Sequence, residues 1–193
     1  DVAGTLTFWG KLVVIILVQI GGLGFVTFAI LAASTLGKRI THGQQALAME
    51  AFNQTNVNEL HSTAVSVIKY TLGIQFIAFI CLGLWWVGLG ASLFDAFFRA
   101  LFHVSMSFNN AGFMLYAADS SIFHRDLVTV LITTFSIIIG GIGFPVLQDL
   151  IHKRRWSRFS VYSKAVIIAT IWLNIIGFVI IWVAVAIYLT DIV

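Results

Sequence analysis

Long apolar runs alternate with short polar segments along this chain of 193 residues. Four runs are each long enough for a helix that crosses a hydrocarbon core of about 30 Å, which requires roughly 20 residues. These four predicted transmembrane helices cover residues 12–36, 63–89, 127–150 and 165–189. A fifth apolar run, residues 93–108, is too short to cross, so it is predicted to enter the membrane and turn back.

The short run carries its own start signal and is followed by a polar loop. Ser92 and Asp95 have the spacing of a capping box, and apolar side chains then recur every three or four residues, which predicts a helix ending near Phe108. Non-helical backbone survives at membrane depth only where protein buries it or where it lines a watery path. The loop at residues 109–113 therefore suggests a pore, in which carbonyls replace the hydration water of a cation and Gly112 supplies backbone freedom. The alternative is a simple turn between two helices.

Two segments of the chain repeat each other. Residues 19–25 read QIGGLGF and residues 138–144 read IIGGIGF, and both lie in predicted spans that run in the same direction. Parallel copies need an even number of crossings per unit. One returning span and a re-entrant segment that crosses nothing meet this requirement. The repeating unit is therefore helix, re-entrant loop, helix, which is the plan of a cation-channel pore.

The glycines of the two repeats have a simpler explanation as well. Small residues in membrane helices let a neighbouring helix approach closely, and this close packing accounts for all of them. Packing and a pore are compatible, because a short pore helix must be cradled by the helix that follows it. Pro145 comes directly after the second repeat and is expected to kink the third span. The glycines expected to pack near the pore are Gly21, Gly22, Gly24, Gly140, Gly141 and Gly143.

Composition and charge place the chain in a membrane. It is 60% hydrophobic and 10% charged, with a mean hydropathy of +1.00, whereas about 25% of a soluble domain is charged. The basic residues cluster after the first span, at Lys38 and Arg39, and within residues 153–164. By the positive-inside rule these segments are cytoplasmic and Asp1 starts outside, which predicts a multi-pass membrane protein.

Two cytoplasmic segments join the spans. Residues 37–62 are predicted to form an ordered connector with a short amphipathic surface helix, because Thr41 and Gln44 have capping-box spacing. Residues 153–164 form a basic loop that either anchors against anionic lipid or docks a cytosolic partner.

The remaining polar residues indicate no other chemistry. The net charge of +3 gathers at membrane edges rather than along a groove, so nucleic acid is not an expected partner. The five histidines lack the paired spacing of a metal site. The sequence contains no nucleophile with a base, no paired carboxylates and no phosphate-binding glycine loop, so catalysis is not indicated. Gln19, Gln75 and Asn174 lie within spans and are expected to hydrogen-bond between helices.

Three phrases together resemble the membrane subunit of the Trk/Ktr/HKT superfamily of potassium transporters, with the Ktr branch the most similar. They are the first glycine repeat, residues 108–113 (FNNAGF), and the second repeat continued through PVL. Members of that family hold four repeats of helix, pore loop and helix around one ion path, and each loop contributes a filter glycine. The resemblance implies that Gly112 is the filter glycine of the second repeat. The residues around it in the implied filter are Asn109, Asn110, Ala111 and Phe113.

The resemblance also divides the chain. Residues 1–36 would hold the second helix of repeat one, residues 63–152 all of repeat two, and residues 165–193 the first helix of repeat three. The parts of repeat two would be its first helix at 63–89, its pore helix at 93–108, its filter loop at 109–113 and its second helix at 127–150. The chain is therefore expected to be a fragment that carries one filter loop of four and does not conduct by itself.

The function implied by the resemblance is that of the ion-conducting subunit of a Trk/Ktr-type uptake system. It implies K⁺ as the transported ion, Na⁺ as a further coupling or activating ion, and no organic cofactor. It also implies a homodimer in the cell membrane, in contact with membrane lipid, with a cytosolic nucleotide-binding regulatory ring as partner. The alternative is a helical scaffold or assembly subunit that does not transport. More short pore helices ending in a loop glycine, in the neighbouring coding sequence, would favour transport.

Overall fold

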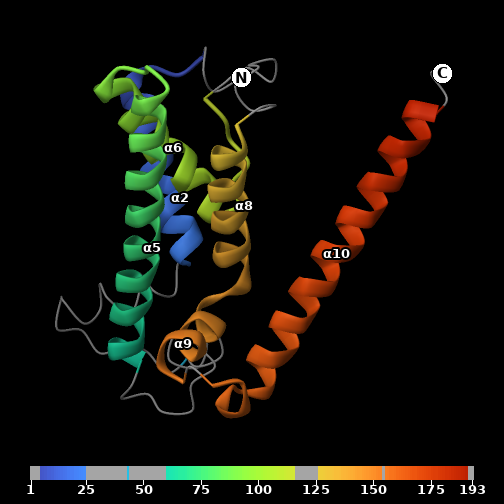
Figure 1. Ribbon diagram of the computed structural model, residues 1–193. Helices are drawn as coiled ribbons and strands as arrows, with labels where there is room; N and C mark the ends of the chain where they lie inside the picture. The colour runs from blue at the N-terminus through green and yellow to red at the C-terminus, as the bar shows by residue number, and fades with distance from the viewer. Residues whose placement is uncertain (1–4, 25–42, 44–59, 116–125, 154, 191–193) are drawn as a thin grey trace. The chain divides into compact units, whose positions relative to one another are not determined.

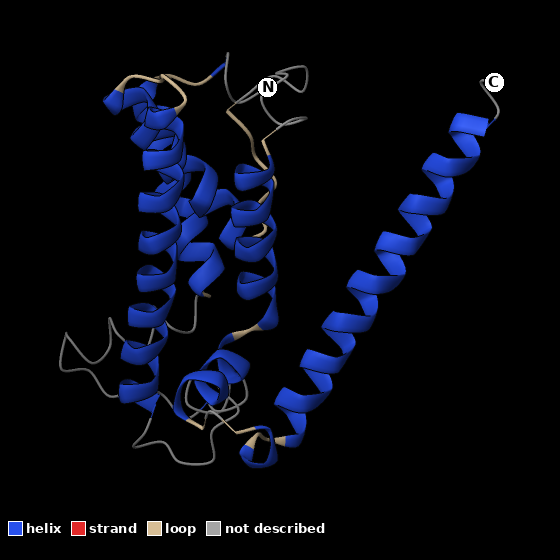
Figure 2. Cartoon of the chain, viewed as in Figure 1, coloured by secondary structure: helices blue, strands red, loops and turns tan. Residues whose placement is uncertain are grey.

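The computed structural model describes residues 5–24, 43, 60–115, 126–153 and 155–190. All regular secondary structure within these ranges is helical (Figure 2). The elements, most of them labelled in Figure 1, are α2 (Phe8–Leu23), α5 (Leu60–Gly88), α6 (Leu93–Phe108), α8 (Leu127–Ile142), α9 (Phe144–His152), the 3₁₀ helix η2 (Trp156–Arg158) and α10 (Val161–Thr190). The chain forms two compact units, Asp1–Gly141 and Ile142–Val193. The predicted connector helix and the second half of the first predicted span lie outside the described residues.

Two of the described helices are long and apolar enough to cross a membrane. They lie within α5 and α10, at Ser62–Gly88 and Val161–Tyr188, where the sequence predicts its second and fourth spans. α8 and α9 pass the same test only when they are taken together as one broken span. α2 and α6 are shorter, at 16 residues each. The fold class is that of an all-α membrane protein, as predicted.

α2 ends at the first glycine repeat and α8 ends at the second, which corrects the prediction that helix continues through Gly24 and through Gly143. α2 ends at Gly24, which adopts φ 80° and ψ 135°, and α8 ends before Gly143, which adopts φ 89° and ψ 156°. Positive φ with extended ψ is open almost exclusively to glycine. The backbone conformation thus requires glycine at the third glycine position of each repeat. Helix packing does not explain this requirement. Pro145 lies in the first turn of α9, where backbone N–H groups have no partner within the helix. Its missing N–H therefore costs no helical hydrogen bond, and the break comes from Gly143 rather than from proline.

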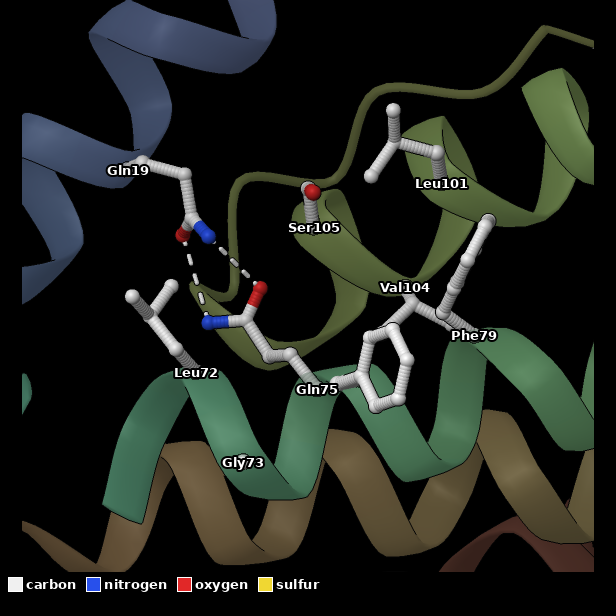
Figure 3. Close-up of a pocket in the computed structure, with 9 residues that line it drawn as sticks. Gln19, Leu72, Gly73, Gln75, Phe79, Leu101, Val104 and Ser105 are labelled. Atoms are coloured by element: carbon white, nitrogen blue, oxygen red, sulfur yellow. Dashed lines mark hydrogen bonds between the residues drawn. The ribbon is translucent and has the colours of Figure 1, made fainter. Parts of the chain in front are cut away.

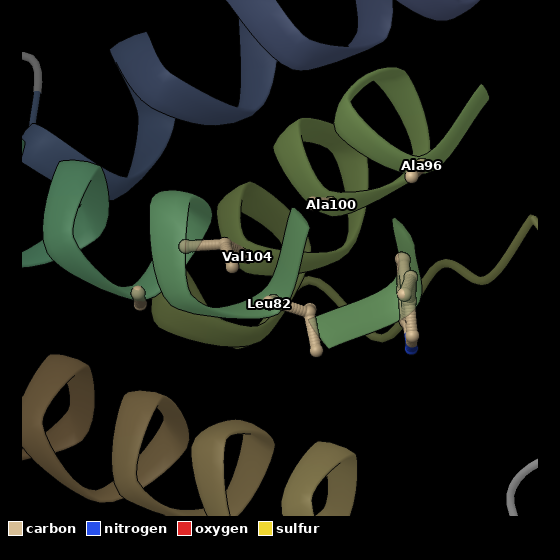
Figure 4. Packing of buried hydrophobic residues seen from close by; sticks show 6 residues of the cluster. Leu82, Ala96, Ala100 and Val104 are labelled. Carbon is tan, nitrogen blue, oxygen red and sulfur yellow. The ribbon is translucent and has the colours of Figure 1, made fainter. Parts of the chain in front are cut away.

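α6 turns back beside α5 and packs against it through small side chains. The buried cluster between them consists of Ala78, Leu82 and Trp86 from α5 and Ala96, Ala100 and Val104 from α6 (Figure 4). Alanines one turn apart on α6 let the two helix backbones approach closely. A second cluster joins α6 to α2, where Phe102 and Met106 meet Ile15. α6 therefore contacts α2 and α5 through two separate groups of buried residues.

The start of α6 confirms half of the predicted capping box. Oγ of Ser92 accepts a hydrogen bond from the N–H of Asp95 at 3.4 Å. The carboxylate of Asp95 pairs instead with Arg99 one turn later, with 2.6 Å between Oδ1 and Nε. Negative charge in the first turn of a helix is favourable, because the helix dipole is positive there. The two oppositely charged residues of this short helix thus lie next to each other.

Hydrogen bonds from two tryptophans join α5 to α8. Nε1 of Trp85 donates to both carboxylate oxygens of Asp126, at 2.9 and 3.0 Å, and Nε1 of Trp86 donates to Oγ1 of Thr129 at 3.0 Å. Asp126 also caps α8, because it accepts from the N–H groups of Val128 and Thr129 at 3.1 Å each. Burial raises the pKa of Asp126, but the hydrogen bonds it accepts, first from Thr129, outweigh this effect and hold the pKa below its ordinary value. The charged carboxylate therefore persists at neutral pH and links the two helices.

A buried histidine joins α6 to α8. Nε2 of His103 lies 2.7 Å from Oγ1 of Thr133, whose hydroxyl donates to the carbonyl of Thr129 at 2.7 Å. Because that hydroxyl has only one proton, the His103 ring must donate its Nε2–H in this pair. The same ring lies edge-on to Trp86, with 5.9 Å between centroids. His103 thus fixes α6 against both α5 and α8.

In the second unit one carboxylate holds the connection between α9 and α10. Oδ2 of Asp149 accepts hydrogen bonds from the N–H of Ser160 and from Oγ of Ser163, both at 2.8 Å. Its Oδ1 pairs with Nζ of Lys153 at 2.6 Å. These bonds join both ends of the predicted basic loop to the last turn of α9.

The contact between α5 and α6 should be sensitive to one methyl group. A Cβ at Gly83 would lie 2.7 Å from ring atoms of Phe97, whose ring also packs edge-on against Phe79 with 5.3 Å between centroids. Gly83→Ala is therefore expected to cost about 1–3 kcal/mol of stability through overpacking. At Gly73 in the same helix no described atom lies within 4 Å of a built Cβ, so Gly73→Ala should gain up to about 1 kcal/mol of helix propensity. Thermal unfolding of the purified protein in detergent measures both, and equal stability of the two variants would contradict this packing.

Candidate functional site

The predicted loop after α6 begins with a helix cap. The N–H of Ala111 donates to the carbonyl of Met106 at 2.9 Å, and the N–H of Asn110 donates to the carbonyl of Ser107 at 3.2 Å. These bonds, with Asn110 in the left-handed conformation at φ 54°, form a Schellman motif. Asparagine is one of the few residues besides glycine that visit this conformation. The start of the loop is thus a turn. Any ion ligands would have to be carbonyls that accept no hydrogen bond from this turn.

The carbonyls near the end of α6 differ in the hydrogen bonds that they accept. Those of residues 105–107 all accept hydrogen bonds from the turn, and that of residue 105 also accepts from Nδ2 of Asn109 at 2.8 Å. The carbonyl of Phe108 lies against Gly140. Within the part of the chain that the structure describes, the carbonyls of residues 109–112 accept no backbone hydrogen bond. These four carbonyls therefore differ from those of residues 105–107, which the turn satisfies.

Gly112 shapes the second half of the loop. Its φ of 72° is a value that residues with a side chain rarely adopt. Among the described residues no atom lies within 4 Å of the place where its Cβ would stand. Gly112 and the exposed Phe113 line a cavity of about 180 Å³, whose walls also include Ser107, Asn110 and Thr133. The predicted filter glycine therefore lies at an open, non-helical position between α6 and α8.

One glycine from each repeat lies directly against the end of α6. A Cβ at Gly22 would overlap the side chain of Asn109, and a Cβ at Gly140 would overlap the carbonyl of Phe108. These positions do not correspond in the two repeats, because Gly22 is the second glycine of its pair and Gly140 is the first. The two helices therefore approach α6 with different faces.

The other predicted glycines differ in their surroundings. Gly141 makes an ordinary contact, because its Cβ would lie 3.7 Å from Nδ2 of Asn110. Around Gly21 the described chain places nothing within 4 Å. Gly24 and Gly143 are the residues that break their helices. The sequence therefore placed six glycines in one group that the structure separates into contact, open and helix-breaking positions.

A cluster of three carboxamides links the loop to two other helices. Gln19 and Gln75 hydrogen-bond to each other between α2 and α5, which confirms the expected contact between helices. Nδ2 of Asn109 joins them by donating to Oε1 of Gln19 at 2.5 Å. Asn174, in contrast, donates to the carbonyl of Thr170 in its own helix at 2.8 Å. The sequence did not predict the participation of Asn109, although three amides in apolar surroundings are a signal that they need partners.

Two helices that are long and apolar enough to cross a membrane, in a chain whose described secondary structure is all helical, define the class, an all-α membrane protein. Residues 1–165 match the sequence profile of TrkH, described as a cation transport protein. The chain belongs to this family, which confirms the resemblance drawn from its sequence. The family is one of cation transporters rather than enzymes.

Several curated relatives match most of the chain. The Ktr system potassium uptake protein B of Bacillus subtilis (strain 168) is 36% identical over 180 residues, which cover 92% of this chain and 40% of the relative. The protein of the same name from Vibrio alginolyticus is 34% identical over 185 residues, or 94% and 40%. The potassium/sodium uptake protein NtpJ of Enterococcus hirae is 27% identical over 170 residues, or 88% and 38%. The chain thus spans about 40% of the length of these relatives.

The contact between Gly140 and Phe108 leads to a matched pair of variants. Gly140→Ala should displace the end of α6, because the new methyl group meets backbone atoms that cannot turn away, and overpacking of this kind costs about 1–3 kcal/mol. Gly141→Ala, the next residue in the same helix, makes only an ordinary contact and should be tolerated. Thermal unfolding of the full-length protein in detergent distinguishes them. If Gly140→Ala were as stable as Gly141→Ala, α8 would not lie this close to α6.

Proposed function

We propose that this chain is part of the ion-conducting subunit of a potassium uptake system and that residues 109–113 contribute to its selectivity filter. The names of two relatives, both potassium uptake proteins, support the choice of ion. The observation that carries the filter is the use of carbonyls at the end of α6. In the described structure those of residues 109–112 follow a helix C-terminus and accept no backbone hydrogen bond.

Such a filter would work by exchanging one set of oxygen ligands for another. A potassium ion gives up its hydration water only where carbonyl oxygens replace it. The C-terminus of α6 carries a partial negative charge equivalent to about half an elementary charge, which favours a cation there. Gly112 at φ 72° permits a backbone path that residues with side chains rarely follow. One loop supplies one wall, and the remaining walls would come from the rest of the subunit.

The helices would then form a repeat of helix, pore helix, filter loop and helix. α5, α6, the loop at residues 109–113 and α8 would make up one such unit. α2 would close the preceding unit, and α10 would open the next. The basic loop at residues 153–164 would face the cytoplasm, with the N-terminus of the chain outside.

The names of the relatives support some features of the wider assembly. K⁺ would be the transported ion, and the name of the potassium/sodium uptake protein supports Na⁺ as a second one. The word system in the names of both Ktr relatives supports a partner subunit. We propose that this partner is a cytosolic nucleotide-binding ring and that the membrane subunit is a homodimer.

The filter assignment is tested by two serine variants at glycines of positive φ. Gly112→Ser in the full-length subunit is expected to lower discrimination of potassium over sodium, because the added side chain crowds the path or turns a carbonyl away. Gly90 is the matched control, since it also has a positive φ, 96°, and no described atom lies within 4 Å of the position that a Cβ would take. Both variants carry backbone strain of roughly 1–2 kcal/mol. Competition of rubidium and sodium uptake in vesicles measures the difference.

Three outcomes of this experiment are informative. Loss of selectivity in Gly112→Ser alone supports the filter. Loss in both variants would assign the effect to strain rather than to the ion path. Equal selectivity in wild type and Gly112→Ser would remove the loop from the path and favour a non-transporting scaffold.

The basic loop is expected to contribute to docking of the ring. Arg155 and Arg158 are exposed, and the ends of the loop are held by Asp149. Replacing Arg154, Arg155 and Arg158 together by Gln should reduce co-purification of the ring subunit at low salt, because surface charge interactions are screened at high salt. Lys11→Gln serves as a control. Unchanged ring binding together with normal insertion would leave only the anchoring of this loop against anionic lipid.

A further inference from the structure

Two glutamine side chains, those of Gln19 and Gln75, lie beside the candidate loop but are not part of it. Nε2 of Gln19 donates to Oε1 of Gln75 at 2.8 Å, and Nε2 of Gln75 donates to Oε1 of Gln19 at 3.3 Å (Figure 3). Gln75 is only 5% exposed. The pair and Ser105 line a cavity of about 470 Å³ whose other walls are largely apolar. A buried amide without a partner is costly, so each of these two side chains depends on the other.

The pair reaches the loop through Asn109, the C-cap residue of α6. Nδ2 of Asn109 donates to Oε1 of Gln19 at 2.5 Å and to the carbonyl of Ser105 at 2.8 Å. Both amide protons of Asn109 are therefore used, and both lone pairs of Oε1 of Gln19 are used as well. One side chain thus connects the end of α6 to α2 directly and to α5 through Gln75.

Steric contact restricts the same side chain from a second direction. Asn109 lies against Gly22, where any Cβ would overlap its side-chain atoms. Gly22 follows Gln19 by three residues on α2, so a single face of α2 both binds Asn109 and makes room for it. Because Asn109 is the first residue of the loop, a shift of its side chain passes to the carbonyls of residues 109–112.

We propose that Gln19 and Gln75 are positioning residues for the filter. They hold Asn109, and with it the adjoining carbonyls, at the spacing that favours potassium over sodium. This inference rests on the proposed function of the loop. Neither glutamine touches the ion, and both act through the hydrogen bonds of one asparagine.

Methionine variants of the full-length subunit test this role, since methionine has a similar length and forms no comparable hydrogen bond. Gln19→Met removes the acceptor of Asn109 and should lower the rubidium-to-sodium selectivity about five-fold, the effect of one hydrogen bond. Its KM for rubidium should rise while its maximal rate changes little. Gln75→Met leaves that acceptor in place and should lower selectivity about two-fold. Asn174→Leu is the control, because its amide bonds only within its own helix in the described structure.

Two further variants separate positioning from simple packing. Gln19→Glu in its neutral form can accept from Asn109 and donate to Gln75, so it should restore most of the selectivity lost in Gln19→Met. Asn109→Ala combined with Gln19→Met should be no worse than Asn109→Ala alone, because both changes remove the same bond. A packing defect would show neither rescue nor this lack of additivity.

The outcomes distinguish failure of the positioning role from failure of the filter. Wild-type selectivity and KM in Gln19→Met, together with a selectivity defect in Gly112→Ser, would overturn the positioning role and keep the filter. Wild-type selectivity in both would overturn the filter itself. If Gln19→Met does not reach the membrane, the selectivities of Gln75→Met and Gln19→Glu test the positioning role instead. Reduced selectivity in the first and near-normal selectivity in the second support positioning, and wild-type selectivity in Gln75→Met overturns it.

Discussion

The end of α6 is a buried helix terminus, and the turn that follows it satisfies the carbonyls of its last turn. A helix leaves its last carbonyls without internal partners, and lipid offers none. Here the turn at Asn110 and the side chain of Asn109 supply donors for the carbonyls of residues 105–107. The carbonyl of Phe108 lies against Gly140. The carbonyls that follow receive no backbone donor in the described structure, and a cation is a partner that would satisfy them.

The neighbouring helices contribute to that terminus in different ways. α2 supplies space at Gly22 and an acceptor at Gln19. α5 supplies a buried contact against the alanines of α6 and, near its C-terminal end, two tryptophans that hydrogen-bond to Asp126 and Thr129. α8 supplies space at Gly140 and a hydroxyl for His103. Specific hydrogen bonds and close backbone contacts therefore act together with the buried apolar side chains of α6 to set the position of the short helix.

The sequence predicted the elements better than the way they end. Apolar run length located α5 and α10, and α6 has the predicted bounds because both its cap residue and its following polar loop are visible in the sequence. The breaks at Gly24 and Gly143 were missed because hydrophobic periodicity carries no information on φ. The contact of Asn109 with Gln19 was missed for a different reason. It joins residues 90 positions apart, and only the packing of α6 against α2 brings them together.

The two glycine repeats show which part of such a motif is local and which depends on context. Gly24 and Gly143 adopt nearly the same positive φ, although one ends α2 and the other precedes α9. This shared conformation requires no common neighbour, so it belongs to the repeat itself. The contact glycines differ, because Gly22 meets a side chain and Gly140 meets a carbonyl of the same short helix. Each repeat approaches α6 from a different side. Because each repeat has two adjacent glycines, either the first or the second of them can contact α6 closely. A pair of glycines followed by a third therefore combines two requirements, adaptable packing against a helix end and a fixed break in the helix beyond it.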